Sequence, residues 1–204
     1  MVNYLETGRR MRASGYVDFP RYRGRERLYG AIAARITEPV LYLEFGVWQG
    51  AARERWSKLP RRPSSEPHGF DSFEGLPWDS QRGRGEFPLH GQAPRFSDPR
   101  IVLHKGWFSE TLPRFQAPRH SQLVVHIDRD LYSSTACVLE ALERYLAPGA
   151  VILFDEFRDR AHEQRAFNGY LARTNRRFTL SGATPTLEQA AFRAAEAGLH
   201  ESGS

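Results

Sequence analysis

The sequence has little that would cross-link, anchor or export it. It contains one cysteine, Cys137, which excludes an internal disulfide bond and a zinc site built from cysteines. It has no run of 18 apolar residues, and its first residues lack the apolar core of a signal peptide. We therefore expect neither a transmembrane helix nor secretion, and a cytoplasmic location is the default.

Long blocks of one charge are also missing. The 204 residues carry a formal net charge of +5, but the arginines are scattered, apart from two groups at 21–27 and 53–62. Neither group is an uninterrupted basic block with interleaved aromatic residues, so nucleic acid is not an expected partner in spite of the basic charge. Hydrophobic residues make up 40% of the chain, which suits one sizeable α/β domain.

Short apolar runs alternate with helical patterns along the chain. Strands are predicted at 40–45, 68–73, 100–104, 123–127, 150–154 and 177–181. Helices are predicted at 25–36, 51–59, 134–146 and 162–174, with a short helix or turn at 109–115. Residues 188–195 suit either a helix or a last edge strand. The alternation predicts right-handed βαβ units and a mostly parallel sheet.

The chain divides into an N-terminal arm and helix at 1–39 and a single domain at 40–204. Within that domain, residues 79–99 are rich in glycine, proline and charged residues and show no periodic pattern. A long irregular segment inside a compact domain is usually functional. We predict that residues 79–99 form a flexible lid.

Acidic residues follow two of the predicted strands directly. Asp128 and Asp130 come after the strand at 123–127, and Asp155 and Glu156 come after the strand at 150–154. In an open α/β sheet, the edge where parallel strands end faces the binding crevice. The alternative is that Asp128 only caps the next helix. A second acidic strand end favours a ligand-binding edge over that alternative.

The first two strands end in acids as well. Glu44 opens the pattern Glu44-x-Gly46-x-x-x-Gly50, and Asp71 lies 27 positions later, one βαβ step along the chain. An acid at the second strand end can accept hydrogen bonds from both ribose hydroxyls of a nucleoside. The glycine pattern is looser than the dinucleotide motif. Each acid alone suits a loop cap equally well, whereas the pair favours a nucleoside cofactor.

Five segments together resemble a known family: residues 43–50, 69–77, 106–113, 126–135 and 154–156. In this order they resemble the macrocin O-methyltransferase family, which includes the mycinamicin and novobiocin sugar O-methyltransferases. The resemblance spans roughly residues 40–180. Two long blocks make it specific: Gly-Phe-Asp-Ser-Phe-Glu-Gly-Leu-Pro, and His-Ile-Asp-x-Asp-Leu-Tyr-Ser-Ser-Thr.

The resemblance implies an α/β, Rossmann-like class I methyltransferase fold, with a mostly parallel seven-stranded sheet flanked by helices. It also implies S-adenosylmethionine and a divalent metal, usually magnesium, as cofactors. The expected reaction is methyl transfer to a hydroxyl of a sugar or other polyhydroxylated natural product.

The resemblance also assigns roles to individual residues. Those expected at the cofactor are Glu44 and Gly46 at its methionine and ribose end, Asp71 with Ser72 beside it at the ribose hydroxyls, and Gly106 and Trp107 flanking the adenine. The expected metal ligands are Asp128, Asp155 and Glu156, oxygen donors of the kind that magnesium prefers.

Metal coordination would lower the pKa of the acceptor hydroxyl and align it with the sulfonium methyl group. Asp128 or His126 would then take the proton, although the sequence favours a hydrogen-bonded core histidine as the interpretation of His126. Arg129 gives an alternative to the metal, because it can neutralise the acids as an ion pair. A non-catalytic protein that retains the fold and the cofactor pocket is the alternative function. The expected partner is a small hydroxylated substrate, and a homo-oligomer is left open.

Overall fold

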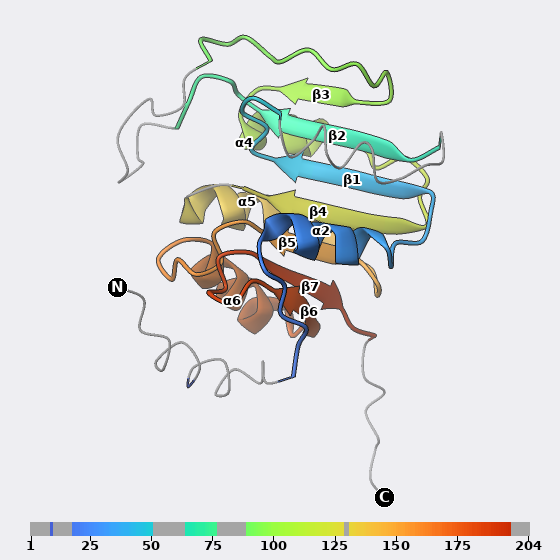
Figure 1. Cartoon of the computed structure of the whole chain (residues 1–204). Coiled ribbons are helices and arrows are strands. Elements are labelled where there is room, and N and C mark those ends of the chain that lie inside the picture. The colour runs from blue at the N-terminus through green and yellow to red at the C-terminus, as the bar shows by residue number, and fades with distance from the viewer. Residues whose placement is uncertain (1–8, 10–17, 51–63, 77–88, 129–130, 197–204) are drawn as a thin grey trace, which may run out of the picture.

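The structure is a computed structural model that describes residues 9, 18–50, 64–76, 89–128 and 131–196. In these residues, seven strands form one sheet in the order β3-β2-β1-β4-β5-β7-β6 (Figure 1). The strands are β1 Val40–Phe45, β2 Glu66–Asp71, β3 Val102–Lys105, β4 Gln122–Ile127, β5 Val151–Phe154, β6 Phe178–Ala183 and β7 Ala190–Ala194. The helices are α2 Arg25–Ala33, α4 Phe108–Thr111, α5 Tyr132–Leu142 and α6 Glu163–Thr174, with 3₁₀ turns η1 Leu112–Arg114 and η2 Glu143–Tyr145.

The pairing of the strands confirms the predicted fold class. β1 pairs in parallel with β2 and β4, β2 with β3, and β4 with β5. β7 runs antiparallel to both of its neighbours, β5 and β6. The ambiguous segment at 188–195 is therefore a strand, but it lies inside the sheet and not at its edge. Its small alanines favour a helix in isolation, and hydrogen bonding on both sides overrides that preference.

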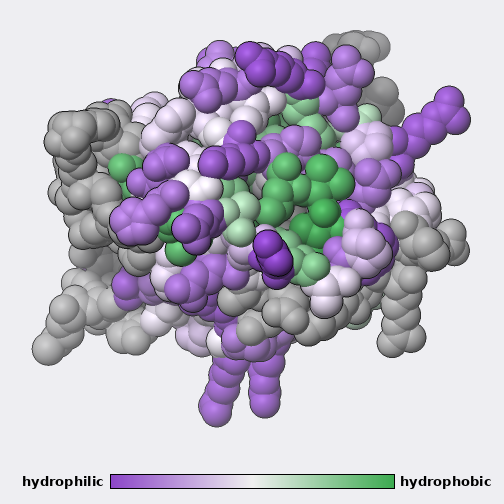
Figure 2. Space-filling view, turned by 90° about the horizontal axis from the view of Figure 1, so that it is seen from above, coloured by the Kyte–Doolittle hydropathy of each residue, from purple (hydrophilic) through white to green (hydrophobic). Residues whose placement is uncertain are grey.

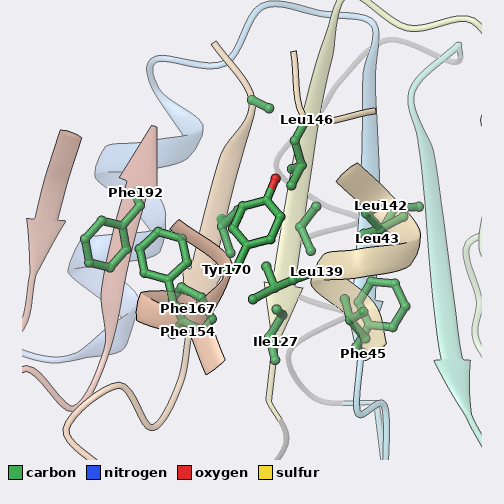
Figure 3. Packing of buried hydrophobic residues seen from close by; sticks show 14 of the residues in the cluster. Leu43, Phe45, Ile127, Leu139, Leu142, Leu146, Phe154, Phe167, Tyr170 and Phe192 are labelled. Carbon is green, nitrogen blue, oxygen red and sulfur yellow. The ribbon is translucent and has the colours of Figure 1, made fainter. Parts of the chain in front are cut away.

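One face of the sheet packs against α5 and α6. Leu43 and Phe45 of β1 and Ile127 of β4 point to this side, because side chains two positions apart share a face. They meet helix residues such as Leu139 of α5 and Phe167 of α6 (Figure 3). All of these side chains are fully buried or nearly so. This layer is the larger part of the core and fixes the sheet on which the strand ends are arranged.

The helix α2 covers the opposite face (Figure 1). Its buried residues Leu28, Tyr29 and Ile32 pack with sheet residues that include Tyr42 and Val124. The segment before α2 is tied to the end of β6 by two backbone hydrogen bonds, from the amide of residue 22 to the carbonyl of residue 183 (2.9 Å) and from the amide of residue 183 to the carbonyl of residue 20 (3.1 Å). The start of α2 is thus held close to the sheet.

The observed elements follow the sequence predictions, with shifted ends. Helix α2 ends three residues before the predicted boundary at 36, and β2 covers 66–71 in place of 68–73. The helix predicted at 51–59 lies outside the described residues. Within the described ranges, every helix is too short or too polar to span a bilayer.

The predicted lid at 79–99 is only partly described, because residues 79–88 lie outside the described ranges. Residues 89–99 contain turns and bends. The amides of Leu89 and Gly91 donate to the carbonyl of Phe73, and the Lys105 ammonium donates to the carbonyl of Gly91 (2.7 Å). This part of the segment lies against the loop after β2, and the mobility of the lid stays a prediction.

β3 forms the outer edge of the sheet at the top of Figure 1. Seen from that side, the surface is mostly hydrophilic, and its hydrophobic residues are gathered mainly in one area (Figure 2). Val102 of β3 is an exposed apolar side chain. The predicted functional residues lie at the ends of the strands, including Gly106 and Trp107 directly after β3.

Candidate active site

The parallel strands bring the predicted acids to one edge of the sheet. Figure 1 shows β1, β2 and β4 side by side with their arrowheads pointing the same way. Glu44 is the penultimate residue of β1, and Asp71 is the last residue of β2. Asp128 and Asp155 directly follow β4 and β5. Glu44, Asp71 and Asp155 are buried, so each needs hydrogen-bonding partners to remain charged.

Asp71 joins the turns that follow β1 and β2. Its Oδ2 accepts a hydrogen bond from the backbone amide of Trp48 (3.0 Å), and its Oδ1 accepts one from the amide of Phe73 (2.9 Å). The neighbouring Ser72 hydroxyl accepts one from the amide of Glu74 (3.2 Å). Asp71 therefore makes the loop-capping bonds that the sequence left as the alternative. A carboxylate has about four lone-pair sites, so these two bonds alone do not use up its capacity to bind a ribose.

The two predicted glycines occupy turns that other residues rarely adopt. Gly46 follows β1 with a φ of 102°, and Gly106 follows β3 with a φ of 140°. Their amides bond to the second strand, Gly46 to the Phe70 carbonyl (3.1 Å) and Gly106 to the Asp71 carbonyl (3.0 Å). Main chain without side chains is thereby presented beside Asp71, where a ligand can approach it closely.

Large aromatic side chains are exposed at these strand ends. Trp107, predicted to flank an adenine, is 37% exposed and precedes α4. Trp48 is 45% exposed and has a φ of 44°, an unusual conformation for a bulky residue. Tyr132, the first residue of α5, is also exposed, and the Arg165 guanidinium lies 4.7 Å from its ring centre. Sequence reasoning did not single out Trp48 or Tyr132, because aromatic residues are common and their exposure depends on the fold.

His126 lies inside the protein between two tyrosines. It is fully buried, with Nε2 3.0 Å from the Tyr29 hydroxyl and Nδ1 2.9 Å from the Tyr42 hydroxyl. The Tyr29 hydroxyl has a single proton, which it donates to Asp155, so the histidine donates from Nε2. His126 thus has the arrangement of the core histidine that the sequence gave as the alternative to a base.

A chain of polar contacts crosses the sheet from one acid to the other. The Tyr29 hydroxyl donates to Asp155 and lies 3.0 Å from Nε2 of His126. The Tyr42 hydroxyl lies 2.9 Å from Nδ1 of His126 and 3.3 Å from Oε2 of Glu44. Tyr42 and Tyr29 belong to the buried cluster on the α2 face of the sheet. Glu44 and His126 are register partners on the neighbouring strands β1 and β4, and the sequence could show neither this register nor which helix would cover them.

Asp155 is held by the N-terminal helix. Its Oδ1 accepts a short hydrogen bond from the Tyr29 hydroxyl (2.6 Å), and its Oδ2 forms an ion pair with Nη1 of Arg25 (3.0 Å). The carboxylate of Asp155 raises the pKa of Arg25, and burial followed by this carboxylate raises the pKa of Tyr29 well above its usual value. Both helix residues are therefore proton donors at neutral pH.

Asp128 and Glu156 are less buried than Asp155. The Asp128 amide donates to the Phe45 carbonyl (2.9 Å), which ties the end of β4 to the end of β1. The Glu156 amide donates to Oε2 of the fully buried Glu163 (2.9 Å). The charge of Asp128 also raises the pKa of Arg25, so Arg25 lies within the field of both aspartates.

Known proteins resemble both the sequence and the fold. A family model described as a methyltransferase domain matches residues 43–157. The chain belongs to this methyltransferase family. The matched range includes all of the predicted site residues, and the class I methyltransferase fold predicted from the motifs is confirmed.

One curated relative is the 8-demethyl-8-(2,3-dimethoxy-alpha-L-rhamnosyl)-tetracenomycin-C 4'-O-methyltransferase of Streptomyces olivaceus. It is 31% identical over 159 residues, which cover 62% of this chain and 58% of that protein. The chain therefore matches less than two thirds of the length of this relative. The relative is a sugar O-methyltransferase by name, in agreement with the resemblance read from the motifs.

Two solved structures share the fold. The calicheamicin methyltransferase CalS11 is 24% identical with a TM-score of 0.64, covering 83% of this chain and 80% of its own. A form of cmcI named Mg-SAM is 17% identical with a TM-score of 0.57, covering 89% of this chain and 79% of its own. At these identities the two structures support the fold alone.

The strand ends on the β1 and β2 side fit the cofactor that a methyltransferase needs. Buried Asp71 is positioned by the two turns, Gly46 and Gly106 present bare main chain, and Trp107 exposes an aromatic surface. These are a hydroxyl acceptor, a close backbone approach and a stacking surface, which suit the ribose and adenine of a nucleoside.

The strand ends on the β4 and β5 side do not fit the predicted metal. In the described part of the chain, no group of three or more histidine, cysteine, aspartate or glutamate side chains is placed to hold an ion. Both carboxylate oxygens of Asp155 already bond to Arg25 and Tyr29. Magnesium requires near-octahedral oxygen ligands, and here one of the three predicted ligands is paired with a guanidinium. Arg129, the predicted ion-pair partner, lies outside the described residues.

Proposed function

We propose that this protein is an S-adenosylmethionine-dependent O-methyltransferase that acts on a hydroxyl of a sugar or other polyhydroxylated natural product. The observation that carries the proposal is Asp71, a buried carboxylate fixed between the turns after β1 and β2. Membership of the methyltransferase family and the rhamnosyl-containing name of the curated relative support this acceptor class.

In this proposal the cofactor supplies an electrophilic methyl group on a sulfonium. Asp71 accepts the ribose hydroxyls, Ser72 lies beside it, and the Gly106–Trp107 turn flanks the adenine. Glu44 and Gly46 line the methionine and ribose end, where a buried carboxylate favours the positive sulfonium. The exposed aromatic side chains at this edge give the acceptor a surface on which to pack.

Asp128 is the residue that we assign to accept the hydroxyl proton. It follows β4 directly, is partly exposed, and has its backbone fixed to β1. His126 is less suited to this role, since both ring nitrogens face tyrosine hydroxyls in the core. A positioned carboxylate that takes the proton in the transition state contributes about 10²–10⁴-fold to the rate.

Metal dependence, the second half of the sequence prediction, is a separate question from methyl transfer. Magnesium bound by Asp128, Asp155 and Glu156 would supply a Lewis acid for the acceptor hydroxyl. The described geometry does not support such a site, so the proposed reaction contains no step through a metal.

The proposed function is tested in two stages. Calorimetry should show that the protein binds S-adenosylmethionine, and labelled S-adenosylmethionine should then transfer its methyl group to one member of a panel of rhamnosyl and other deoxysugar glycosides. Reactions with and without chelator address the metal. Binding of the cofactor without transfer to any polyhydroxylated acceptor would instead identify a non-catalytic protein with a retained pocket.

A further inference from the structure

Arg25 is placed at the acidic edge by the geometry of helix α2. It is the first residue of the helix, and Tyr29 lies four residues later, one turn along the same face. The Arg25 guanidinium is 3.0 Å from Oδ2 of Asp155, and the Tyr29 hydroxyl is 2.6 Å from Oδ1. One helix face therefore engages both oxygens of the same carboxylate.

Asp155 cannot easily turn away from these partners. Its amide donates to the Ile127 carbonyl (3.0 Å), and its own carbonyl accepts from the Gln189 side chain (3.0 Å). Its side chain is only 5% exposed. A buried carboxylate needs compensation for its charge, and removal of its partner is costly. A divalent ion at this position would have to displace the guanidinium or share the carboxylate with a second positive charge.

The positive charge of Arg25 interacts favourably with more than one acid. Asp155 makes the largest favourable contribution to its charged form, and Asp128 adds to it. These are two of the three residues that the sequence predicts as metal ligands. The guanidinium stays charged at every physiological pH, and its planar array of donors matches a carboxylate.

We propose that Arg25 supplies the positive charge beside the acids at the ends of β4 and β5. Its guanidinium occupies the position that the motifs predict for a divalent metal. The wild-type protein then has no tight divalent site at Asp155. The inference also rests on the proposed function in one respect, since it makes methyl transfer independent of added metal. Arg25 acts through Asp155 and is therefore a positioning residue.

The direct test is a titration of the protein with Mn²⁺, followed by the electron paramagnetic resonance signal of the free ion, and with Mg²⁺ by calorimetry. Neither S-adenosylmethionine nor an acceptor is present. Arg25→Met retains the side-chain length and removes the charge, whereas Arg25→Lys retains the charge. Arg27→Met is the matched control, because Arg27 is an exposed arginine of the same helix.

Wild type, Arg27→Met and Arg25→Lys should bind both ions weakly. Arg25→Met should bind them at least about tenfold more tightly, as expected when a competing cation is removed. Addition of Asp155→Asn to Arg25→Met should abolish the gain, which would locate the new site at Asp155. The inference is overturned if the wild-type protein already binds the ions tightly, or if Arg25→Met binds them no more tightly than the wild type does.

Folding is checked by the melting temperature of each variant in chelator. Arg25→Gln provides a second uncharged variant if Arg25→Met proves too unstable to titrate. Failure of the proposed function is distinguishable from failure of this inference. A protein that neither binds S-adenosylmethionine nor transfers methyl groups, but gains metal affinity in Arg25→Met, would overturn only the function. Loss of wild-type methyl transfer after chelation, restored by Mg²⁺, would overturn only the inference.

Discussion

The acidic residues at the strand ends form two halves of one edge, one at β1 and β2 and the other at β4 and β5. The two halves differ in where the hydrogen-bonding partners of their acids come from. On the β1 and β2 side, Asp71 bonds to the amides of Trp48 and Phe73, both in the turns that immediately follow these strands. On the β5 side, Asp155 bonds to Arg25 and Tyr29, which are 130 and 126 residues away in sequence. The first half is built from the turns that follow two adjacent strands, and the second from the packing of a helix that is distant in sequence.

This difference has a chemical consequence. Backbone amides fix a carboxylate without removing its net negative charge, so Asp71 remains suited to receive hydroxyl groups from a ligand. A guanidinium neutralises the carboxylate that it fixes, so Asp155 is much less attractive to a second cation. Two acids with similar positions in the sheet therefore have different capacities for binding.

The largest expected effect tests the β5 half. Asp155→Ala removes the acceptor of both helix residues and leaves the Tyr29 hydroxyl buried without it. We expect the free energy of unfolding to fall by about 2–3 kcal/mol, less than for a fully buried pair because Arg25 is half exposed. Urea denaturation measures the change.

The matched control for that variant is Glu143→Ala, which breaks an ion pair with Arg173 on the surface. Its side chains are 36% and 54% exposed, so a loss of at most about 1 kcal/mol is expected. Equal losses in the two variants would show that the contacts of Asp155 are no more important than a surface pair.

The next effect tests the β2 half. Asp71→Asn retains the shape of the side chain but replaces a charged acceptor with a neutral one. S-adenosylmethionine affinity should fall about tenfold, the size of one charge-assisted hydrogen bond. Calorimetry gives the dissociation constant. Asp98→Asn, which alters an acid paired with Arg100, is the control and should bind the cofactor normally. An unchanged affinity in Asp71→Asn would remove the ribose assignment.

A smaller effect is expected for Tyr29→Phe, which sharpens the comparison by removing only one hydroxyl. That hydroxyl donates a hydrogen bond to Asp155 and lies 3.0 Å from Nε2 of His126. The loss should be about 1 kcal/mol in unfolding free energy. Combined with Arg25→Met, the two changes should be non-additive, because both residues bond to the same carboxylate. Strict additivity in a double-mutant cycle would argue against a coupled site.

The smallest effect concerns Cys137 on α5. Burial raises the pKa of its thiol above the usual value, with Glu140 adding to the shift, so its reaction with a disulfide reagent at pH 8 should be slower than that of an unfolded thiol. Because α5 packs on the face of the sheet opposite to α2, the native-state rate should be the same in Asp155→Ala as in wild type. A faster reaction in that variant would show that the loss of stability extends through the sheet to α5.

The sequence by itself determined the parts of this protein that depend on neighbouring residues. Apolar runs such as 123–127 predicted buried strands, and their alternation with helical patterns predicted the parallel sheet. Once the sheet is parallel, the acids after successive strands must share an edge. Gly46 follows β1 and Asp71 ends β2, so the sequence around each residue was enough to predict its place at that edge.

Only the tertiary structure decided which side chains meet across long separations. Periodicity places Arg25 and Tyr29 on one face of a helix, but it does not show which face of the sheet that helix covers or how far along the strands it lies. For the same reason, periodicity did not predict the position of β7 between β5 and β6, because the pairing of β7 depends on strands that are distant in sequence. The partner of Asp155 was therefore set by packing of the N-terminal helix, and Arg25 could not be identified from the sequence around the acids.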